Sequence, residues 1–119
     1  MQSSAINLAT IHRLRELDDF HSMGLVRQLV TSFLKSADDS LARVVVAINE
    51  GNAGELRQVA HSTKSSAANL GAEALARCYG NLEKSGREGR IDEARAVLEE
   101  TRDEQRRVLR QLRELLEGI

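Results

Sequence analysis

The feature that most constrains the fold is the spacing of the apolar residues, which recur every three or four positions along almost the whole chain. This is the period of an amphipathic α-helix, whereas a half-buried strand alternates every second residue. The 119 residues include no proline or tryptophan and only two Phe and one Tyr. Strand-rich domains use more aromatic and β-branched residues. We therefore expect an all-α protein, folded as one domain over residues 1–119.

Breaks in the apolar pattern divide the chain into helices. Asn7 is expected to cap a short first helix, and residues 18–22 are expected to connect it to the next. A second helix is predicted over about residues 23–50. At 1.5 Å per residue it would be about 42 Å long, which allows a kink between residues 36 and 40.

Three more helices follow. Asn52, in a glycine-containing break, is a candidate N-cap for a third helix that ends at Gly71, where glycine permits the left-handed closing conformation. A fourth helix begins near Ala72 and stops within residues 86–89. Asp92 then lies in the first turn of the fifth, where a carboxylate suits the helix dipole.

The helical spacing also predicts which residues face the core, and from these faces we expect an antiparallel four-helix bundle with a short additional N-terminal helix as a lid. The predicted inward residues are Leu8, Ile11, Leu14 and Leu17; Val26, Leu29, Phe33, Ala37, Leu41, Val44 and Ile48; Leu56, Val59, Ala60, Thr63, Ala67 and Leu70; Leu75, Cys78, Leu82 and Ser85; and Ile91, Ala94, Leu98, Thr101, Gln105, Val108, Leu112 and Leu115.

His61 is predicted to point into solvent. On a wheel of the third helix it lies about 160° from the direction of the core residues. Arg57, Gln58 and Ala68 share its half of the helix and are expected to contact a partner. An exposed histidine in a helical protein is most often an ordinary surface residue, so this position alone does not establish a function.

The chemistry around His61 suits phosphoryl transfer. A neutral imidazole is a competent nucleophile near pH 7. Ser65, one turn later, is small and leaves the approach of a partner clear, as in-line transfer requires. Lys64 is expected to stabilise the transferred oxygens as a compact positive charge.

The stretch from Ala60 to Ala72 resembles the active helix of histidine-containing phosphotransfer (HPt) domains of bacterial phosphorelays. The family pattern is Ala-His, then Leu-Lys-Gly-Ser-Ser, then a glycine ten residues after the histidine. The resemblance covers about residues 20–115. The matching positions are Ala60, His61, Lys64, Ser66 and Gly71 in this helix, Leu75, Cys78, Leu82 and Glu83 in the next, and Phe33, Leu34 and the turn over 47–52 before it.

Two positions depart from the family pattern. Ser65 stands where the family usually has glycine, which narrows the approach of a partner and puts partner choice or transfer rate in doubt. Thr63 replaces the usual leucine on the buried face, where its hydroxyl can donate to the carbonyl of Val59 at a small loss of packing.

The resemblance implies that the chain carries a phosphoryl group between response-regulator receiver domains, with a hybrid sensor kinase as a further possible partner. Mg²⁺ would come from the receiver, and the chain itself would bind no cofactor. Glu83 occupies a family position near the histidine, where it would orient the imidazole, and Arg87 would reach the phosphoryl group or an acidic partner surface. For both residues the alternative is an ordinary solvated side chain.

Other functions are disfavoured. The formal net charge of -1 lacks the basic excess of a nucleic-acid surface. There is no apolar run of about 20 residues for a membrane span, no secretory leader and no glycine-rich nucleotide loop, so we expect a carrier that is not a kinase. The lone Cys78 suits a core position and a reducing cytoplasm. His12, Asp18 and His21 lack a second Glu-x-x-His-type pair, so no metal site is predicted.

Two alternatives to the phosphorelay intermediate remain open. The first is an adaptor with the same fold that binds a receiver or kinase domain without carrying phosphate, which the departure at Ser65 keeps open. The second is a structural bundle that dimerises through the arginine-rich last helix, although the alternating charges there are typical of a solvated face, and a monomer is expected.

Overall fold

The computed structural model describes residues 5–21 and 24–118, without the side chains of residues 17–21. The only regular secondary structure in these ranges is helical, which confirms the all-α prediction. No helix in these ranges is long and apolar enough to cross a membrane. The helices are α1 (Leu8–His21), α2 (Leu25–Asn49), α3 (Ala53–Asn69), α4 (Glu73–Glu88) and α5 (Ile91–Glu117).

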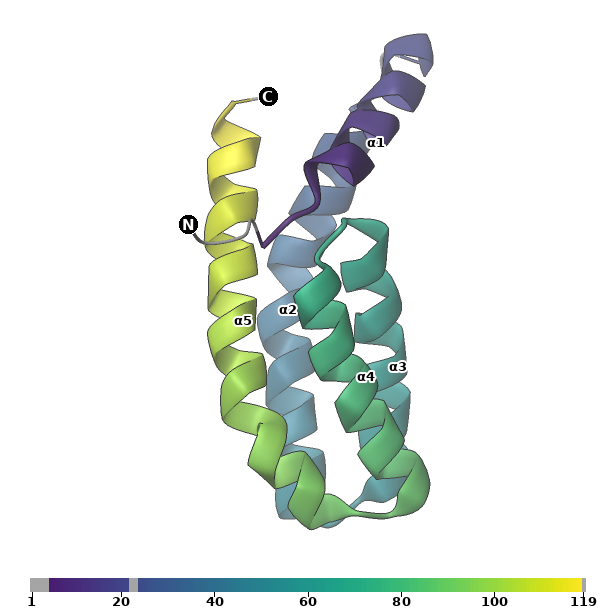
Figure 1. Cartoon of the computed structure of the whole chain (residues 1–119), viewed down its shortest axis with the longest axis vertical. Coiled ribbons are helices and arrows are strands. Elements are labelled where there is room, and N and C mark those ends of the chain that lie inside the picture. Colours follow the sequence, from purple (N-terminus) through teal and green to yellow (C-terminus); the bar gives the residue numbers. More distant parts are fainter. Residues whose placement is uncertain (1–4, 22–23, 119) are drawn as a thin grey trace.

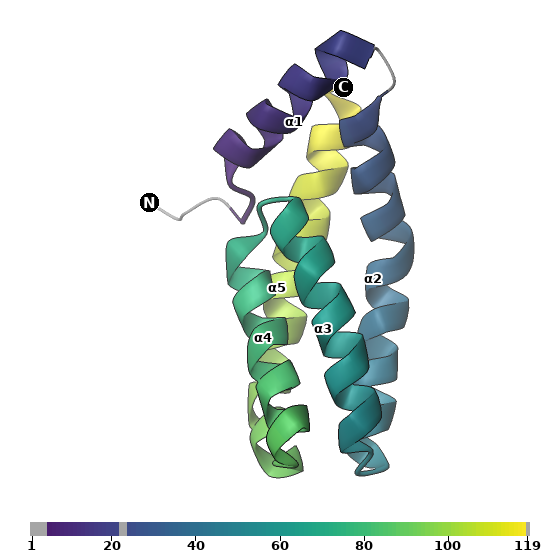
Figure 2. The same ribbon diagram turned by 90° about the vertical axis from the view of Figure 1, so that its right-hand side faces the viewer.

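Helices α2 to α5 lie side by side, and consecutive helices run in opposite directions (Figures 1 and 2). Helix α3 packs between α2 and α4, and α5 completes the arrangement by contacting both α4 and α2. Helix α1 slants away at one end, beyond the turn between α3 and α4, where it contacts α2. The core therefore lies between the four long helices, and the outer faces of α3 and α4 stay open.

The predicted helix ends at both sides of α3 are confirmed. The side chain of Asn52 accepts a hydrogen bond from Glu55 N at 3.1 Å, as an N-cap does. Gly71 has a φ of 76°, in the left-handed region that closes a helix. Gly71 is also needed for space, because a Cβ there would lie 2.9 Å from Cβ of Thr10. Two separate constraints thus require glycine at this turn.

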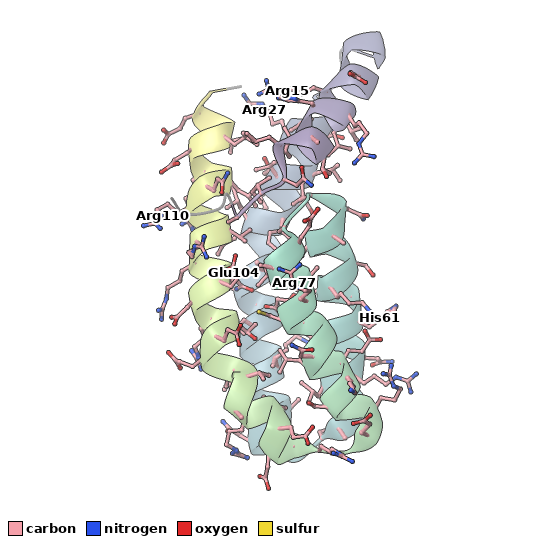
Figure 3. All side chains as sticks on the ribbon, viewed as in Figure 1. Arg15, Arg27, His61, Arg77, Glu104 and Arg110 are labelled. Carbon is pink, nitrogen blue, oxygen red and sulfur yellow. The ribbon has the colours of Figure 1, made fainter. Side chains whose placement is uncertain are left out.

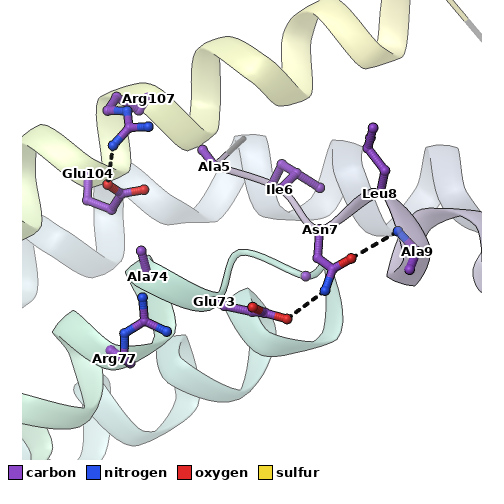
Figure 4. Close-up of a pocket in the computed structure, with 11 residues that line it drawn as sticks. Ala5, Ile6, Asn7, Leu8, Ala9, Glu73, Ala74, Arg77, Glu104 and Arg107 are labelled. Atoms are coloured by element: carbon purple, nitrogen blue, oxygen red, sulfur yellow. Dashed lines mark hydrogen bonds and ion pairs between the residues drawn. The ribbon is translucent and has the colours of Figure 1, made fainter. Parts of the chain in front are cut away.

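The segment before α1 fastens this helix to the rest of the chain. Asn7 caps α1 by accepting a hydrogen bond from Ala9 N at 3.0 Å, as predicted, and its Nδ2 donates to Glu73 Oε1 at 2.8 Å (Figure 4). The backbone N of Ile6 donates to Gln111 Oε1 at 3.2 Å, and the Ile6 side chain is buried. The segment therefore bridges α4 and α5.

Two predictions near the N-terminus are wrong. Residues 18–22 were expected to form a connection, but α1 continues to His21. Aspartate lowers helix propensity by only a fraction of a kcal/mol, so the two aspartates are not sufficient to end the helix. The chain turns at Gly24 instead, with a φ of 64°. Leu8, predicted to face inward, is 50% exposed, whereas Ile6, two residues earlier, is buried. The predicted inward orientation of Leu17 lies outside the described side chains.

The rest of the core follows the predicted faces, although some predicted positions are only partly buried. All six predicted inward residues of α3 are buried, and α2 is continuous through residues 36–40. The sequence analysis missed Tyr79, a fully buried side chain on α4. Its hydroxyl donates to Gln105 Oε1, and Gln105 Nε2 donates to the carbonyl of Ala37 at 3.1 Å. This buried polar network joins α4, α5 and α2.

Candidate functional site

His61 lies on the outer face of α3, opposite the core. Its side chain is 62% exposed, whereas the neighbouring Ala60 is fully buried. Figure 3 shows the imidazole projecting away from the helices at the edge of the molecule. Because α3 is packed between α2 and α4, the imidazole is mounted on a rigid element but remains open to a partner.

A carboxylate from α4 contacts His61. Glu83 Oε2 lies 2.8 Å from Nδ1 of His61, and the other oxygen, Oε1, lies 2.6 Å from Nζ of Lys64. The Glu83 side chain is only 10% exposed, so it approaches the imidazole from beneath. The structure thus brings together three residues that the sequence analysis singled out.

These contacts determine which ring nitrogen carries the proton. The hydrogen bond from Lys64 is the main cause that holds the pKa of Glu83 below its ordinary value, with a further contribution from His61, while burial opposes both. An ionised carboxylate can only accept hydrogen bonds. Nδ1 of His61 must therefore donate, and in the neutral ring the free lone pair belongs to Nε2.

The surface beside the imidazole forms a shallow recess. Arg57 and Gln58, one turn before His61, line it together with Gly54, Ser62 and Glu83. Two of the residues predicted to contact a partner thus border the histidine. Arg87, the other charged residue predicted to contact a partner, is exposed near the end of α4 and is not part of this recess.

A second, more apolar groove continues from the other side of the site. Lys64, Ser65 and Ala68 line it from α3, as their shared helix face predicts. Its α4 wall was missed, because the sequence analysis named only Glu83 and Arg87 outside the inward face of that helix. A wheel of α4 centred on Glu83 would have shown part of this wall, which consists of Ala76, Arg77, Gly80 and Asn81.

The two departures from the family pattern are accommodated within α3. Thr63 Oγ1 donates to the carbonyl of Val59 at 2.8 Å, which confirms the predicted bond. Ser65 Oγ donates to the carbonyl of His61 at 3.2 Å, and the residue remains exposed. Both hydroxyls are therefore bonded to their own helix.

Other candidate features lie away from this site. A recess between the N-terminal segment, α4 and α5 contains the ion pair between Glu104 and Arg107 at 2.9 Å (Figure 4), but no histidine. The side chains of Asp18 and His21 lie outside the described residues. In the remainder, no group of three or more His, Cys, Asp or Glu side chains is placed to hold a metal ion.

The core position of Cys78 is confirmed, and oppositely charged residues of α5 form ion pairs. Cys78 is 7% exposed. The α5 pairs occur at i, i+3 spacing and join Arg102 with Glu99, Arg106 with Asp103 and Arg107 with Glu104.

Comparison with known proteins identifies the family. The model of the Hpt domain family matches residues 28–119. Among solved structures, the histidine-containing phosphotransfer protein B from Pseudomonas aeruginosa PAO1 has the same fold, with 24% identity, a TM-score of 0.86 and 99% of each chain covered. No curated protein sequence matches. The family match spans most of the chain and includes His61. The chain therefore belongs to the Hpt domain family and has a phosphotransfer role in a phosphorelay.

Proposed function

We propose that the chain is a phosphorelay intermediate, in which His61 takes a phosphoryl group from the aspartyl phosphate of one receiver domain and passes it to an aspartate of another. The observation that carries this proposal is the hydrogen bond of 2.8 Å between His61 Nδ1 and Glu83. It leaves Nε2 as the nucleophilic nitrogen of an imidazole that is 62% exposed.

The transfer step follows from this arrangement. The lone pair of Nε2 attacks phosphorus, a new N–P bond forms, and the P–O bond to the aspartate of the receiver breaks to release a carboxylate. The imidazole gains positive charge as the bond forms. The carboxylate of Glu83 already faces Nδ1–H, where it stabilises that charge without reorganisation. Transfer to the second receiver runs through the same bonds in reverse.

Lys64 is proposed to act on the phosphoryl oxygens as well as on Glu83. In this structure Nζ lies 2.6 Å from Glu83 Oε1, which occupies one of its three N–H donors. The side chain is 38% exposed, so the remaining donors are accessible from the partner's side. Lys64 is thus suited to hold Glu83 ionised and to attract a phosphoryl group with the same ammonium.

The docking face is proposed to combine the recess around His61 with the groove beside Ser65. Arg57, Gln58 and Ala68 would contact the receiver, and Arg87 would reach its acidic rim. Mg²⁺ and its acidic ligands would come from the receiver domain, and a hybrid sensor kinase is a further candidate partner. We propose that the chain is a single-domain monomer in the cytoplasm. Its fold would be an antiparallel four-helix bundle, with α1 as a short additional helix.

The decisive experiment is transfer from a receiver domain labelled with radioactive phosphate. The wild-type chain should gain label that is stable to base and labile to acid, as expected for phosphohistidine, and His61→Gln should gain none. Because His61 is exposed, this substitution should change the free energy of unfolding by no more than about 0.5 kcal/mol. Label in His61→Gln equal to wild type, or label mapped to His12, would refute the assignment.

The same experiment separates the carrier from the adaptor. A receiver that binds the wild-type chain, donates no label and binds His61→Gln equally well would favour an adaptor role. Dimerisation through α5 that does not respond to changes at His61 would favour a structural bundle.

A further inference from the structure

Two glycines of α4 flank Glu83 at equal distances along the helix. Gly80 lies three residues before it and Gly86 three residues after it, so all three share one face. Because α3 and α4 run in opposite directions, this face meets α3 in a regular order. Lys64 lies opposite Gly80, His61 opposite Glu83, and Arg57 opposite Gly86.

At Gly86 the two helices touch backbone to backbone. A Cβ at this position would lie 2.8 Å from Arg57 N, 2.9 Å from Ala53 O and 3.0 Å from Arg57 Cα. Real Cβ contacts do not occur at such distances, and backbone atoms inside a helix cannot turn away as a side chain can. Any larger residue at Gly86 must therefore push α4 away from α3.

At Gly80 the contact is with the Lys64 side chain. A Cβ there would lie 3.4 Å from Lys64 Cδ. The aliphatic part of Lys64 thus crosses α4 over Gly80 before its Nζ reaches Glu83 Oε1. Because this side chain is flexible, a methyl group at Gly80 would displace it only slightly.

We infer that Gly86 is a positioning residue for phosphotransfer: it lets α4 approach α3 closely enough for Glu83 to hold Nδ1 of His61, and Gly80 assists by leaving room for Lys64. Glycine is less favourable than alanine inside a helix, so its place in the interior of α4 calls for a packing reason. The close approach supplies one at the turn next to Glu83. This inference rests on the proposed role of His61.

The test is Gly86→Ala, followed by ¹⁵N NMR of the His61 ring and by the transfer assay. In the wild type the neutral ring should carry its proton on Nδ1. In Gly86→Ala the longer distance to Glu83 should shift the ring toward the Nε2–H form and slow transfer by about tenfold, as expected for a weakened charged hydrogen bond. Gly118→Ala, in which a Cβ lies an ordinary 3.6 Å from Leu115 O, is the control and should change neither.

A double-mutant cycle separates positioning from general damage. Gly86→Ala should slow transfer in the wild-type background but have little further effect in a Glu83→Ala background, because its action runs through Glu83. An equal loss in both backgrounds would overturn the inference, as would a folded Gly86→Ala chain with wild-type tautomer and transfer rate.

A second variant keeps the inference testable if Gly86→Ala does not fold. Gly80→Ala meets only the flexible side chain of Lys64, at the near edge of ordinary contact, so it should fold. The slight displacement of the Lys64 ammonium from Glu83 should raise the pKa of Glu83 by a small amount that ¹³C NMR can measure. An unchanged titration of Glu83 would count against the role of the flanking glycines. The tautomer measurement needs no receiver, so a shifted tautomer in a chain that accepts no phosphate would refute the proposed function and leave the positioning role intact.

Discussion

Two of the polar networks that join helices in the described part of this protein differ in how much water reaches them. In the first, Tyr79, Gln105 and the carbonyl of Ala37 connect α4, α5 and α2 inside the core. In the second, His61 and Glu83 connect α3 and α4 at the surface, with Lys64 as a third member. Tyr79 is fully buried, whereas the His61 side chain is 62% exposed.

The comparison shows how the same kind of contact can serve stability or reactivity. In the core, Gln105 uses its carbonyl oxygen for Tyr79 and its amide for Ala37, so loss of a partner leaves a buried polar group unsatisfied. At the surface, only one nitrogen of His61 is engaged, and Nε2 remains available for chemistry. We therefore expect changes in the core network to alter stability and changes in the surface network to alter transfer.

The largest effect on stability is expected from Gln105→Leu. The leucine retains most of the volume but leaves the Tyr79 hydroxyl without its acceptor, which should lower the free energy of unfolding by about 1–3 kcal/mol. Folded molecules should transfer phosphate at the wild-type rate. Denaturant unfolding and the transfer assay measure the two effects separately. Adding Tyr79→Phe removes the orphaned hydroxyl and should recover much of the loss; no recovery would mean that shape, and not hydrogen bonding, dominates this network.

The next largest effect, now on transfer, is expected from Glu83→Gln. A neutral amide has one acceptor oxygen and cannot hold both Lys64 Nζ and His61 Nδ1–H as the carboxylate does. Transfer should slow by about tenfold, the equivalent of a weakened charged hydrogen bond, while the melting temperature changes little. A large loss of stability with normal transfer would reverse the distinction between the two networks.

Glu83 also predicts a pH dependence of stability. Because the pKa of Glu83 in the folded chain lies below its ordinary value of 4.5, its contacts stabilise the fold above pH 4.5, and this contribution is lost as the pH falls through the folded pKa. Unfolding measured from pH 7 downward should show a steeper decline for wild type than for Glu83→Gln. Parallel curves would show that the ionisation of Glu83 does not contribute to the free energy of unfolding.

The sequence predicted the core network and the surface network to different extents. Helical spacing identified the buried face of α3. Because the 3.6-residue repeat of a helix fixes where every side chain lies around its axis, it also predicted that His61 points away from the core. It also placed Gln105 in the core but missed Tyr79, because the inward face assigned to α4 followed only Leu75, Cys78, Leu82 and Ser85. Family resemblance, and not spacing, pointed to Glu83. The role proposed for Gly86 depends on the distance between two helices, which no single-helix pattern contains.

A smaller effect is expected from Lys64→Ala. The side chain is 38% exposed and its ion pair lies at the rim of the site, so the free energy of unfolding should change by no more than about 0.5 kcal/mol. Transfer should slow, because Glu83 loses the partner that most favours its ionised form. Stopped-flow transfer assays and thermal melts test this prediction. If transfer were unchanged at an unchanged melting temperature, Lys64 would be an ordinary surface residue.

The smallest effect is expected from Ser65→Gly, which restores the residue usual in the family. The Ser65 hydroxyl is already bonded to the carbonyl of His61, so its loss removes a bond within α3 and no contact with the imidazole ring. Glycine should cost about 0.5 kcal/mol of helix stability while transfer stays the same or becomes slightly faster.

The matched variant Ser65→Gln places a long side chain in the groove beside Lys64 and Ala68, without touching the core, and should weaken transfer strongly at an unchanged melting temperature. If Ser65→Gly instead loses transfer, the hydroxyl must leave the helix carbonyl and take part in the reaction. If Ser65→Gln transfers as fast as wild type, the receiver docks elsewhere, and only the recess on the Arg57 side of His61 remains as the contact surface.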